Sequence, residues 1–131
     1  MGRRVWTRRV RAAVLLSLAI LVSTAARLLF GRAVVDGNSM APAFLPGDRI
    51  LYGPAFSLRA GDVIVLADPR QSDRLIVKRV HQIPGDLVDV RGDNEFASTD
   101  GRHFGPVPLS LVRGRVFYRY APRERAGWLR Q

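Results

Sequence analysis

The segment LIVKRVHQI at residues 75–83 decides how the body of this chain is expected to fold. Successive side chains of a strand point to opposite faces, so Lys78 shares one face with Ile76 and Val80. Comparable runs rich in Val and Ile recur after residue 31, separated by Gly, Pro and Asp turns, without helical periodicity or internal repeats. The sequence therefore predicts a mainly β body, with strands at residues 32–35, 48–52, 62–67, 75–83, 87–91 and 113–120.

The composition excludes several classes of protein. A chain of 131 residues supports one ordinary domain, not a large multi-domain enzyme. It contains no cysteine, which excludes disulfide scaffolds, thiolate zinc sites and cysteine nucleophiles. The two histidines, His81 and His103, are too few for a histidine-based metal cage. We therefore expect no metal and no cofactor, and any nucleophile has to be a hydroxyl.

The net charge of +10 is concentrated at the N-terminus. Residues 1–32 contain seven Arg and no acidic residue, whereas residues 33–131 contain fourteen basic and eleven acidic residues, a balance of +3. This distribution indicates a basic arm on a mildly basic domain, not a nucleic-acid-binding surface, so we expect no nucleic-acid partner. Twenty of the 21 basic residues are Arg, and Lys78 is the single Lys.

An apolar run follows the basic arm. Residues 12–30 form a stretch of 19 residues, about the minimum for crossing a bilayer, with Arg27 near one end. Five Arg before the run and two beside its end predict a cytoplasmic N-terminus and a domain outside. We expect a basic cytoplasmic arm at 1–11, a transmembrane helix at 12–30, a β-rich domain at 31–121 and a loosely ordered polar tail at 122–131. A cleaved signal peptide, cut near residues 23–25, and a buried core helix are the alternatives.

Ser39 and Lys78 are the candidates for a hydroxyl nucleophile and for its base. Ser39 lies among the turn-forming residues GNSMAP at 37–42, where it either caps a surface turn or serves as a nucleophile. Burial among apolar side chains lowers the pKa of a lysine, because it disfavours the ammonium. The neutral amine accepts a proton from a serine hydroxyl, whereas a guanidinium stays protonated. A GC-rich coding sequence that favours Arg is the alternative explanation for a single Lys.

The segment GNSMAPAF at residues 37–44 resembles the nucleophile box of type I signal peptidases, which are membrane-bound Ser-Lys endopeptidases. Further segments are similar to the other boxes of that family and follow in the same order: GDVI at 61–64, KRV at 78–80 with PGD at 84–86, GDN at 92–94 with Ser98, Asp100 and Arg102, and GPV at 105–107. The resemblance covers residues 12–120. It implies a small antiparallel β catalytic domain with one N-terminal transmembrane helix.

The resemblance also implies roles for individual residues. Ser39 would attack the scissile carbonyl, Lys78 would act as general base, and Ser98 would orient the lysine amine. The backbone N–H of Ser39 would donate to the developing oxyanion. A salt bridge between Asp100 and Arg102 would hold the last box in place.

Three more residues have supporting roles in this resemblance. Met40 would pack beside the site, and Asp93 and Asn94 would shape the turn beneath it. The chain departs from the family at Gly37, where some members have a Ser that serves as a second oxyanion donor. Only thirteen residues separate the lysine from Gly92, so this is a short form without the inserted second domain of many members.

The implied function is that of a membrane-anchored serine endopeptidase that removes signal peptides from translocated precursors. Its expected place is the cell membrane, crossed once, with precursor proteins and membrane lipid as partners and the substrate bound as an extended peptide. One alternative is a maturation protease dedicated to a single partner, such as a nickel superoxide dismutase precursor. The other is a non-catalytic anchored β domain, or an RNA-binding module that uses aromatic and basic residues at 115–120.

Overall fold

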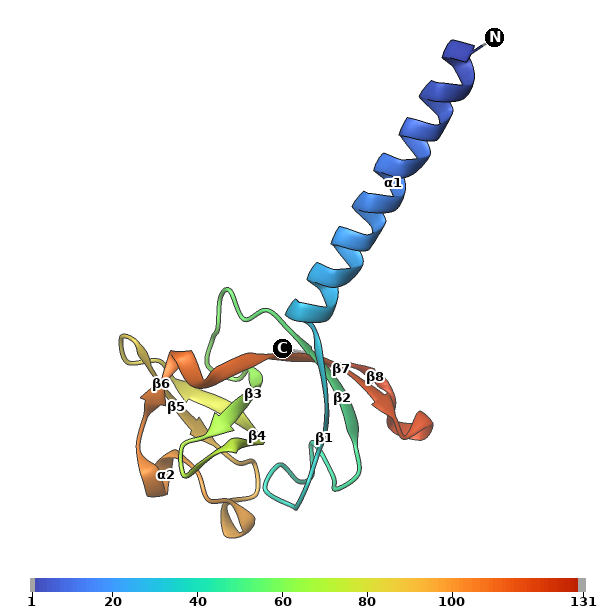
Figure 1. Ribbon diagram of the computed structural model, residues 1–131. Helices are drawn as coiled ribbons and strands as arrows, with labels where there is room; N and C mark the ends of the chain where they lie inside the picture. Colours follow the sequence, from blue (N-terminus) through green and yellow to red (C-terminus); the bar gives the residue numbers. More distant parts are fainter. Residues whose placement is uncertain (1, 130–131) are drawn as a thin grey trace.

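The structure, a computed structural model, describes residues 2–129 and the side chains from residue 7 onwards. A long helix, α1 (Gly2–Leu29), projects from a small β domain (Figure 1). The strands are β1 (Gly31–Val34), β2 (Arg49–Gly53), β3 (Val63–Asp68), β4 (Gln71–Gln82), β5 (Leu87–Arg91), β6 (Val107–Pro108), β7 (Val112–Ala121) and β8 (Gly127–Trp128). They pair antiparallel in the order β1-β2-β7-β3-β4-β5-β6, with β8 on β7. The predicted fold class, a mainly β antiparallel domain with one N-terminal apolar helix, is confirmed.

The six predicted strands are present, and the differences from the prediction concern the start of β4 and several short elements. β4 begins at Gln71 instead of residue 75, because its first residues are polar and exposed and conceal the alternation. β6 and β8 have two residues each, too few for alternation to show. The described residues also form single-turn helices that lack a helical period: η1 (Glu95–Ala97), α2 (Gly101–Phe104), η2 (Leu109–Leu111) and η3 (Arg123–Arg125).

The central strand β3 is buried on both faces and separates two apolar clusters. The first cluster contains Met40 and Phe44, which belong to the predicted nucleophile segment. The second contains Ile76 and Val80, which lie on either side of Lys78 on one face of β4, as alternation predicts. Because β3 contributes alternate residues to both clusters, it joins the serine segment to the lysine strand.

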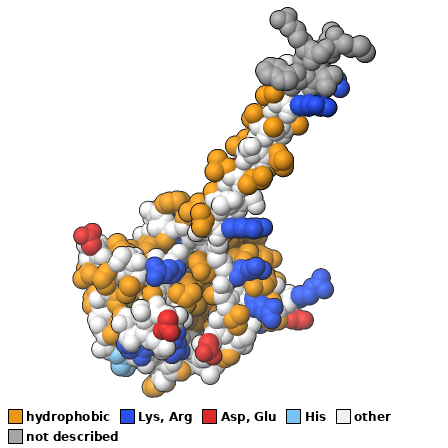
Figure 2. All heavy atoms as spheres, viewed as in Figure 1, with side chains coloured by type: hydrophobic (Ala, Val, Ile, Leu, Met, Phe, Trp, Pro, Cys, Tyr) orange, Lys and Arg blue, Asp and Glu red, His pale blue; other side chains and the backbone are white. Residues whose placement is uncertain are grey.

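α1 is exposed on all sides in the described part of the chain. Its segment Thr7–Leu29 has 23 residues with a mean hydropathy of 2.1, and its apolar window has no buried residue. At about 1.5 Å per residue this segment spans about 34 Å, enough for a hydrocarbon core of about 30 Å. Figure 2 shows apolar side chains along the helix and basic ones near both of its ends. The helix is thus long and apolar enough to cross a membrane, and its exposure contradicts the core-helix alternative.

The structure extends α1 beyond the apolar run. The helix begins at Gly2, so the arm expected at residues 1–11 continues into the helix without a break, apart from residue 1, which lies outside the described residues.

The C-terminal segment is more ordered than the loose tail that its polar composition predicts. β8 pairs with β7, and Trp128 stacks on Phe117 with ring centroids 5.9 Å apart. Leu129 packs against the first apolar cluster. These few apolar residues find partners in a distant strand, which local composition does not reveal.

Asp48 fastens this segment to the turn before β2. Its carboxylate is 1% exposed and accepts hydrogen bonds from the Leu45 N–H at 2.9 Å and from the Arg125 guanidinium at 3.0 Å. A second guanidinium, that of Arg119 in β7, lies 3.3 Å away. Three donors therefore compensate for the burial of one charge.

We predict that Asp48→Asn lowers the free energy of unfolding by about 2 kcal/mol, because a buried amide cannot satisfy two guanidinium groups. Thermal unfolding of the full chain in detergent micelles, followed by tryptophan fluorescence, measures the change. Asp73→Asn is the matched control, since Asp73 is exposed. Equal melting temperatures for the two variants would contradict this role of Asp48.

Candidate active site

The segment around Ser39 is held by the core on one side and by a glycine turn on the other. Met40 and Phe44 are 0% and 1% exposed, and the Phe44 N–H donates to the Met40 carbonyl at 2.9 Å. Gly37 has a φ of 75°, a conformation that favours glycine. Half-buried Ser39 therefore lies between the Gly37 turn and the buried side chains of Met40 and Phe44. Gly37 itself has no side chain that could act as a second oxyanion donor.

The turn after β5 lies directly against this segment. The Asn94 N–H donates to the Ser39 carbonyl at 2.9 Å. A Cβ on Gly92 would lie 2.5 Å from the Ser39 carbonyl oxygen and 2.2 Å from the Ser98 Oγ. These distances are shorter than any Cβ contact tolerates, so only glycine permits the approach. The Asn94 backbone thus ties this turn to the Ser39 segment.

Lys78 is buried in β4 and has one side-chain hydrogen-bond partner among the described residues. The residue is 4% exposed, and its Nζ donates to the Ser98 Oγ at 3.0 Å. Burial lowers the pKa of the Lys78 amine below its ordinary value of 10.5, against the opposing effect of the Asp100 carboxylate. The positive charges of Arg70 and Arg102 lower this pKa further. The environment therefore favours the neutral amine.

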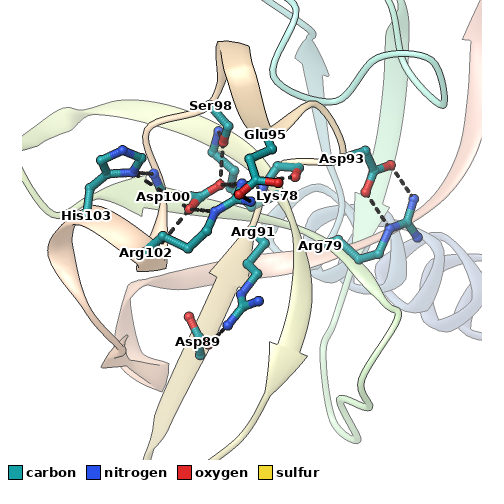
Figure 3. A network of polar contacts seen from close by, with 11 residues as sticks. Lys78, Arg79, Asp89, Arg91, Asp93, Glu95, Ser98, Asp100, Arg102 and His103 are labelled. Atoms are coloured by element: carbon teal, nitrogen blue, oxygen red, sulfur yellow. Dashed lines mark hydrogen bonds and ion pairs between the residues drawn. The ribbon is translucent and has the colours of Figure 1, made fainter.

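Ser98 connects the amine to a buried carboxylate (Figure 3). The Ser98 hydroxyl donates to the Asp100 Oδ2 at 2.5 Å, so its oxygen is left to accept from Lys78. The Gly92 N–H also donates to this Oδ2, at 2.7 Å. Arg102 binds both carboxylate oxygens, Nε to Oδ1 at 3.0 Å and a terminal nitrogen to Oδ2 at 2.7 Å. The Asp100–Arg102 ion pair that the resemblance implies is present in the structure.

Asp100 remains ionised despite its complete burial. Burial alone would raise its pKa, but hydrogen bonds from Arg102, the Gly92 backbone and Ser98 hold the pKa well below its usual range. Asp100 also caps the short helix α2, where its Oδ1 accepts from the Arg102 N–H at 3.1 Å. The carboxylate therefore fixes both the Ser98 hydroxyl and the loop that carries it.

Neither histidine bonds to the side chain of Lys78 or of Ser98. His81 is exposed and lies at an irregularity in the pairing of β4 with β5. His103 is exposed, and its Nδ1 accepts from the Asp100 N–H at 3.3 Å, which completes the cap of α2. Among the described residues, no group of three His, Asp or Glu side chains could hold a metal ion.

Ser39 and Lys78 line one cavity of about 230 Å³, which lies between the end of β1 and β4. Met40 also lines it, together with Val34, Arg74 and Thr99. Among the hydrogen bonds of the described residues, none joins the Ser39 Oγ to the Lys78 Nζ. The structure therefore brings the two residues to a common cavity and leaves the direct bond unformed.

Asp93 faces away from this cavity. Its carboxylate binds the Arg79 guanidinium at 2.6 and 2.7 Å, and Arg79 also donates to the Gly61 carbonyl at 2.8 Å (Figure 3). Asp93 thus ties the turn after β5 to β4 and to the turn before β3. The sequence predicts no role for Arg79, because nothing in the local pattern shows which turns approach this arginine.

Residues 6–94 match the family described as signal peptidase, peptidase S26. The chain belongs to this family. It is 34% identical to the mitochondrial ATP-independent inner membrane protease subunit 1a of Arabidopsis thaliana, over 79% of this chain and 78% of the relative. It is 30% identical to the mitochondrial inner membrane protease subunit 1 of Mus musculus, over 76% and 75%, and 30% identical to subunit 2 of that organism, over 71% and 68%.

The family and these relatives identify the chain as a serine protease of the signal peptidase type, so the resemblance read from the boxes is confirmed. They favour a protease over the non-catalytic and RNA-binding alternatives. The relatives are membrane proteases by name, and this chain has one N-terminal helix able to cross a membrane.

We predict that Asp100→Asn destabilises the protein at neutral pH by about 2 kcal/mol and that the loss shrinks in acid. The folded-state pKa of Asp100 lies below its ordinary value of 3.8, so the ionised carboxylate contributes its full stability above that value. The contribution declines as the pH falls through the folded-state pKa.

Melting temperatures of the wild type and of Asp100→Asn, measured from neutral to acidic pH, should therefore keep their full difference down to about pH 4 and begin to converge only below it. Asp86→Asn, at an exposed position, is the control and should follow the wild type. A difference that widens in acid would contradict the assignment of Asp100 as a stabilising ionised group.

Proposed function

We propose that this protein is a membrane-anchored endopeptidase that removes signal peptides from precursors, with Ser39 as nucleophile and Lys78 as general base. The observation that carries the proposal is the buried Lys78 amine, which shares a cavity with the Ser39 side chain. A serine hydroxyl needs a base near the operating pH, and a lysine with a lowered pKa is such a base. The family assignment supports the same chemistry.

In the first step, the Ser39 Oγ attacks the scissile carbonyl carbon while its proton moves to the Lys78 Nζ. The backbone N–H of Ser39 donates to the oxyanion of the tetrahedral intermediate. The resulting ammonium returns the proton to the leaving amine as the peptide bond breaks. Water then attacks the acyl-enzyme, its proton passes to Lys78 and back to the Ser39 Oγ, and the acid product leaves.

Ser98 and Asp100 position the amine for this proton transfer. A neutral amine has two N–H groups and one lone pair. Since one N–H donates to the Ser98 Oγ at 3.0 Å, the lone pair remains available for the Ser39 proton. An extended substrate in the cavity excludes water and draws the Ser39 Oγ toward that lone pair, and catalytic hydrogen bonds commonly tighten in this way on substrate binding.

The substrate lies between the end of β1 and β4, where Val34 lines the cavity on one side and residues 74–78 line it on the other. An extended peptide there adds a strand beside these segments. Precursors emerging from the membrane reach the site because α1 anchors the domain to the bilayer. Arg8, Arg9 and Arg11 at the start of the apolar helix support a cytoplasmic N-terminus and an extracytoplasmic β domain.

We predict that Ser39→Ala and Lys78→Arg each reduce cleavage of a signal-peptide reporter by at least about 1,000-fold, since each removes a group that the first step requires. Melting temperatures of both variants report whether the fold is retained. Ser110→Ala, at an exposed position, is the control for loss of a hydroxyl and should cleave like the wild type. Substantial cleavage by Lys78→Arg would show that another group is the base.

We also predict that kcat/KM for a peptide without ionisable groups rises with pH and levels off above the lowered pKa of Lys78, at a midpoint below 10.5. The value of kcat/KM rises with pH because only the neutral amine of Lys78 accepts the serine proton, and the neutral fraction grows as the pH increases. The measurement is initial rates of the detergent-solubilised protein across the pH range. A flat profile between about pH 5 and pH 9 would argue for a different base.

A further inference from the structure

A second cavity lies at the junction between α1 and the β domain, apart from the candidate active site. This junction cavity has a volume of about 510 Å³ and is bordered by the last turns of α1 together with β1, β2 and β7. Its lining includes Ser23, Ala26, Arg27, Phe30, Arg32 and Phe117. None of these residues contributes to the network around Lys78.

The helix presents one face to the junction cavity. Ser23, Ala26 and Arg27 line the cavity from helix positions three and four residues apart, the spacing of a single helical face, and Phe30 follows directly after the last helical residue. Ser23 and Ala26 have small side chains, so the helix surface on the membrane side of Arg27 leaves room for a neighbouring chain. That surface suits a hydrocarbon chain lying along the helix.

The opposite wall of the junction cavity is aromatic. The Phe30 ring meets the Phe117 ring edge to face, with centroids 5.9 Å apart, and Phe117 stacks on Trp128. Trp128 is 74% exposed. Aromatic rings of this kind are enriched at the level of lipid headgroups, where one side of the ring is apolar and the other is wet.

The charge of the junction cavity is uncompensated. Arg27 and Arg32 both line it, and neither has an acidic partner among the described residues. Figure 2 shows basic side chains gathered where the helix meets the domain. Two free guanidinium groups at the end of an apolar groove match a phosphodiester attached to a hydrocarbon chain.

We propose that the junction cavity binds one anionic phospholipid, with its phosphodiester between Arg27 and Arg32 and an acyl chain along Ser23 and Ala26. The proposal rests on the membrane anchor of the proposed function, because a helix that crosses the bilayer through Leu29 holds both arginines at headgroup level. The bound lipid fixes the angle between α1 and the β domain, and with it the height of the active site above the membrane.

The test is native mass spectrometry of the full chain in detergent, titrated with dioleoyl phosphatidylglycerol or with dioleoyl phosphatidylcholine. We expect the first phosphatidylglycerol to bind more tightly than the first phosphatidylcholine. Arg27→Gln and Arg32→Gln should each weaken that first binding by about fivefold, with no effect on phosphatidylcholine. Arg49→Gln is the matched control, since Arg49 is an exposed arginine of the neighbouring strand β2 that does not line the junction cavity.

Equal binding of the two lipids would overturn the proposal, and so would an equal loss in the Arg49→Gln control, which would indicate diffuse electrostatic attraction. Displacement of the phosphatidylglycerol by the apolar segment of a precursor, with no arginine dependence, would assign the junction cavity to substrate instead. Flotation of the wild type with vesicles of pure phosphatidylcholine tests the anchor separately. Cleavage of a short soluble peptide, which the arginine variants should retain, tests the protease separately.

Discussion

The burial of a single amine is the constraint on which the rest of this site depends. Lys78 lies between Ile76 and Val80 on a strand face that packs into the core, and its Nζ has the Ser98 hydroxyl as its hydrogen-bond partner. Burial of a charged group without a compensating partner is costly, so the amine is driven toward its neutral form. The Asp100 carboxylate acts in the opposite direction, but it is already engaged by Arg102, Gly92 and Ser98. The arrangement keeps a basic amine available without a histidine.

The fold provides this environment through close approaches between segments that are distant along the chain. β3 is buried on both faces and joins the cluster beside Ser39 to the cluster beside Lys78. Gly92 lets the turn after β5 reach both the Ser39 carbonyl and the Ser98 hydroxyl. A small domain can hold these parts in place because each segment is fastened by a buried or bidentate polar contact, as Asp93 is by Arg79. In this chain a short β domain therefore carries the site without an inserted second domain.

The strand pattern and the strand face that Lys78 occupies could be predicted from the sequence, whereas the contacts that hold the site could not. Alternation at residues 75–83 predicts that Lys78 shares a face with two branched residues, since the period of a strand is a local property. The Asp100–Arg102 pair follows from the resemblance of its segment to a known box. The bonds from Arg125 to Asp48 and from the Asn94 backbone to Ser39 depend on tertiary approach, and no local pattern encodes them. Short elements such as β8 were missed because two residues do not show a period.

The central claim is that Lys78 is neutral at a pH where an ordinary lysine is charged, and one measurement tests it directly. Lys78 is the single lysine of the chain, so labelling with ¹³Cε-lysine produces one lysine side-chain signal. Titration of its chemical shift in the folded, detergent-solubilised protein reports the pKa of this amine alone. The account predicts a midpoint below the ordinary value of 10.5 and a shift toward that value on denaturation. A midpoint at or above 10.5 in the folded protein would contradict the assignment of Lys78 as the general base.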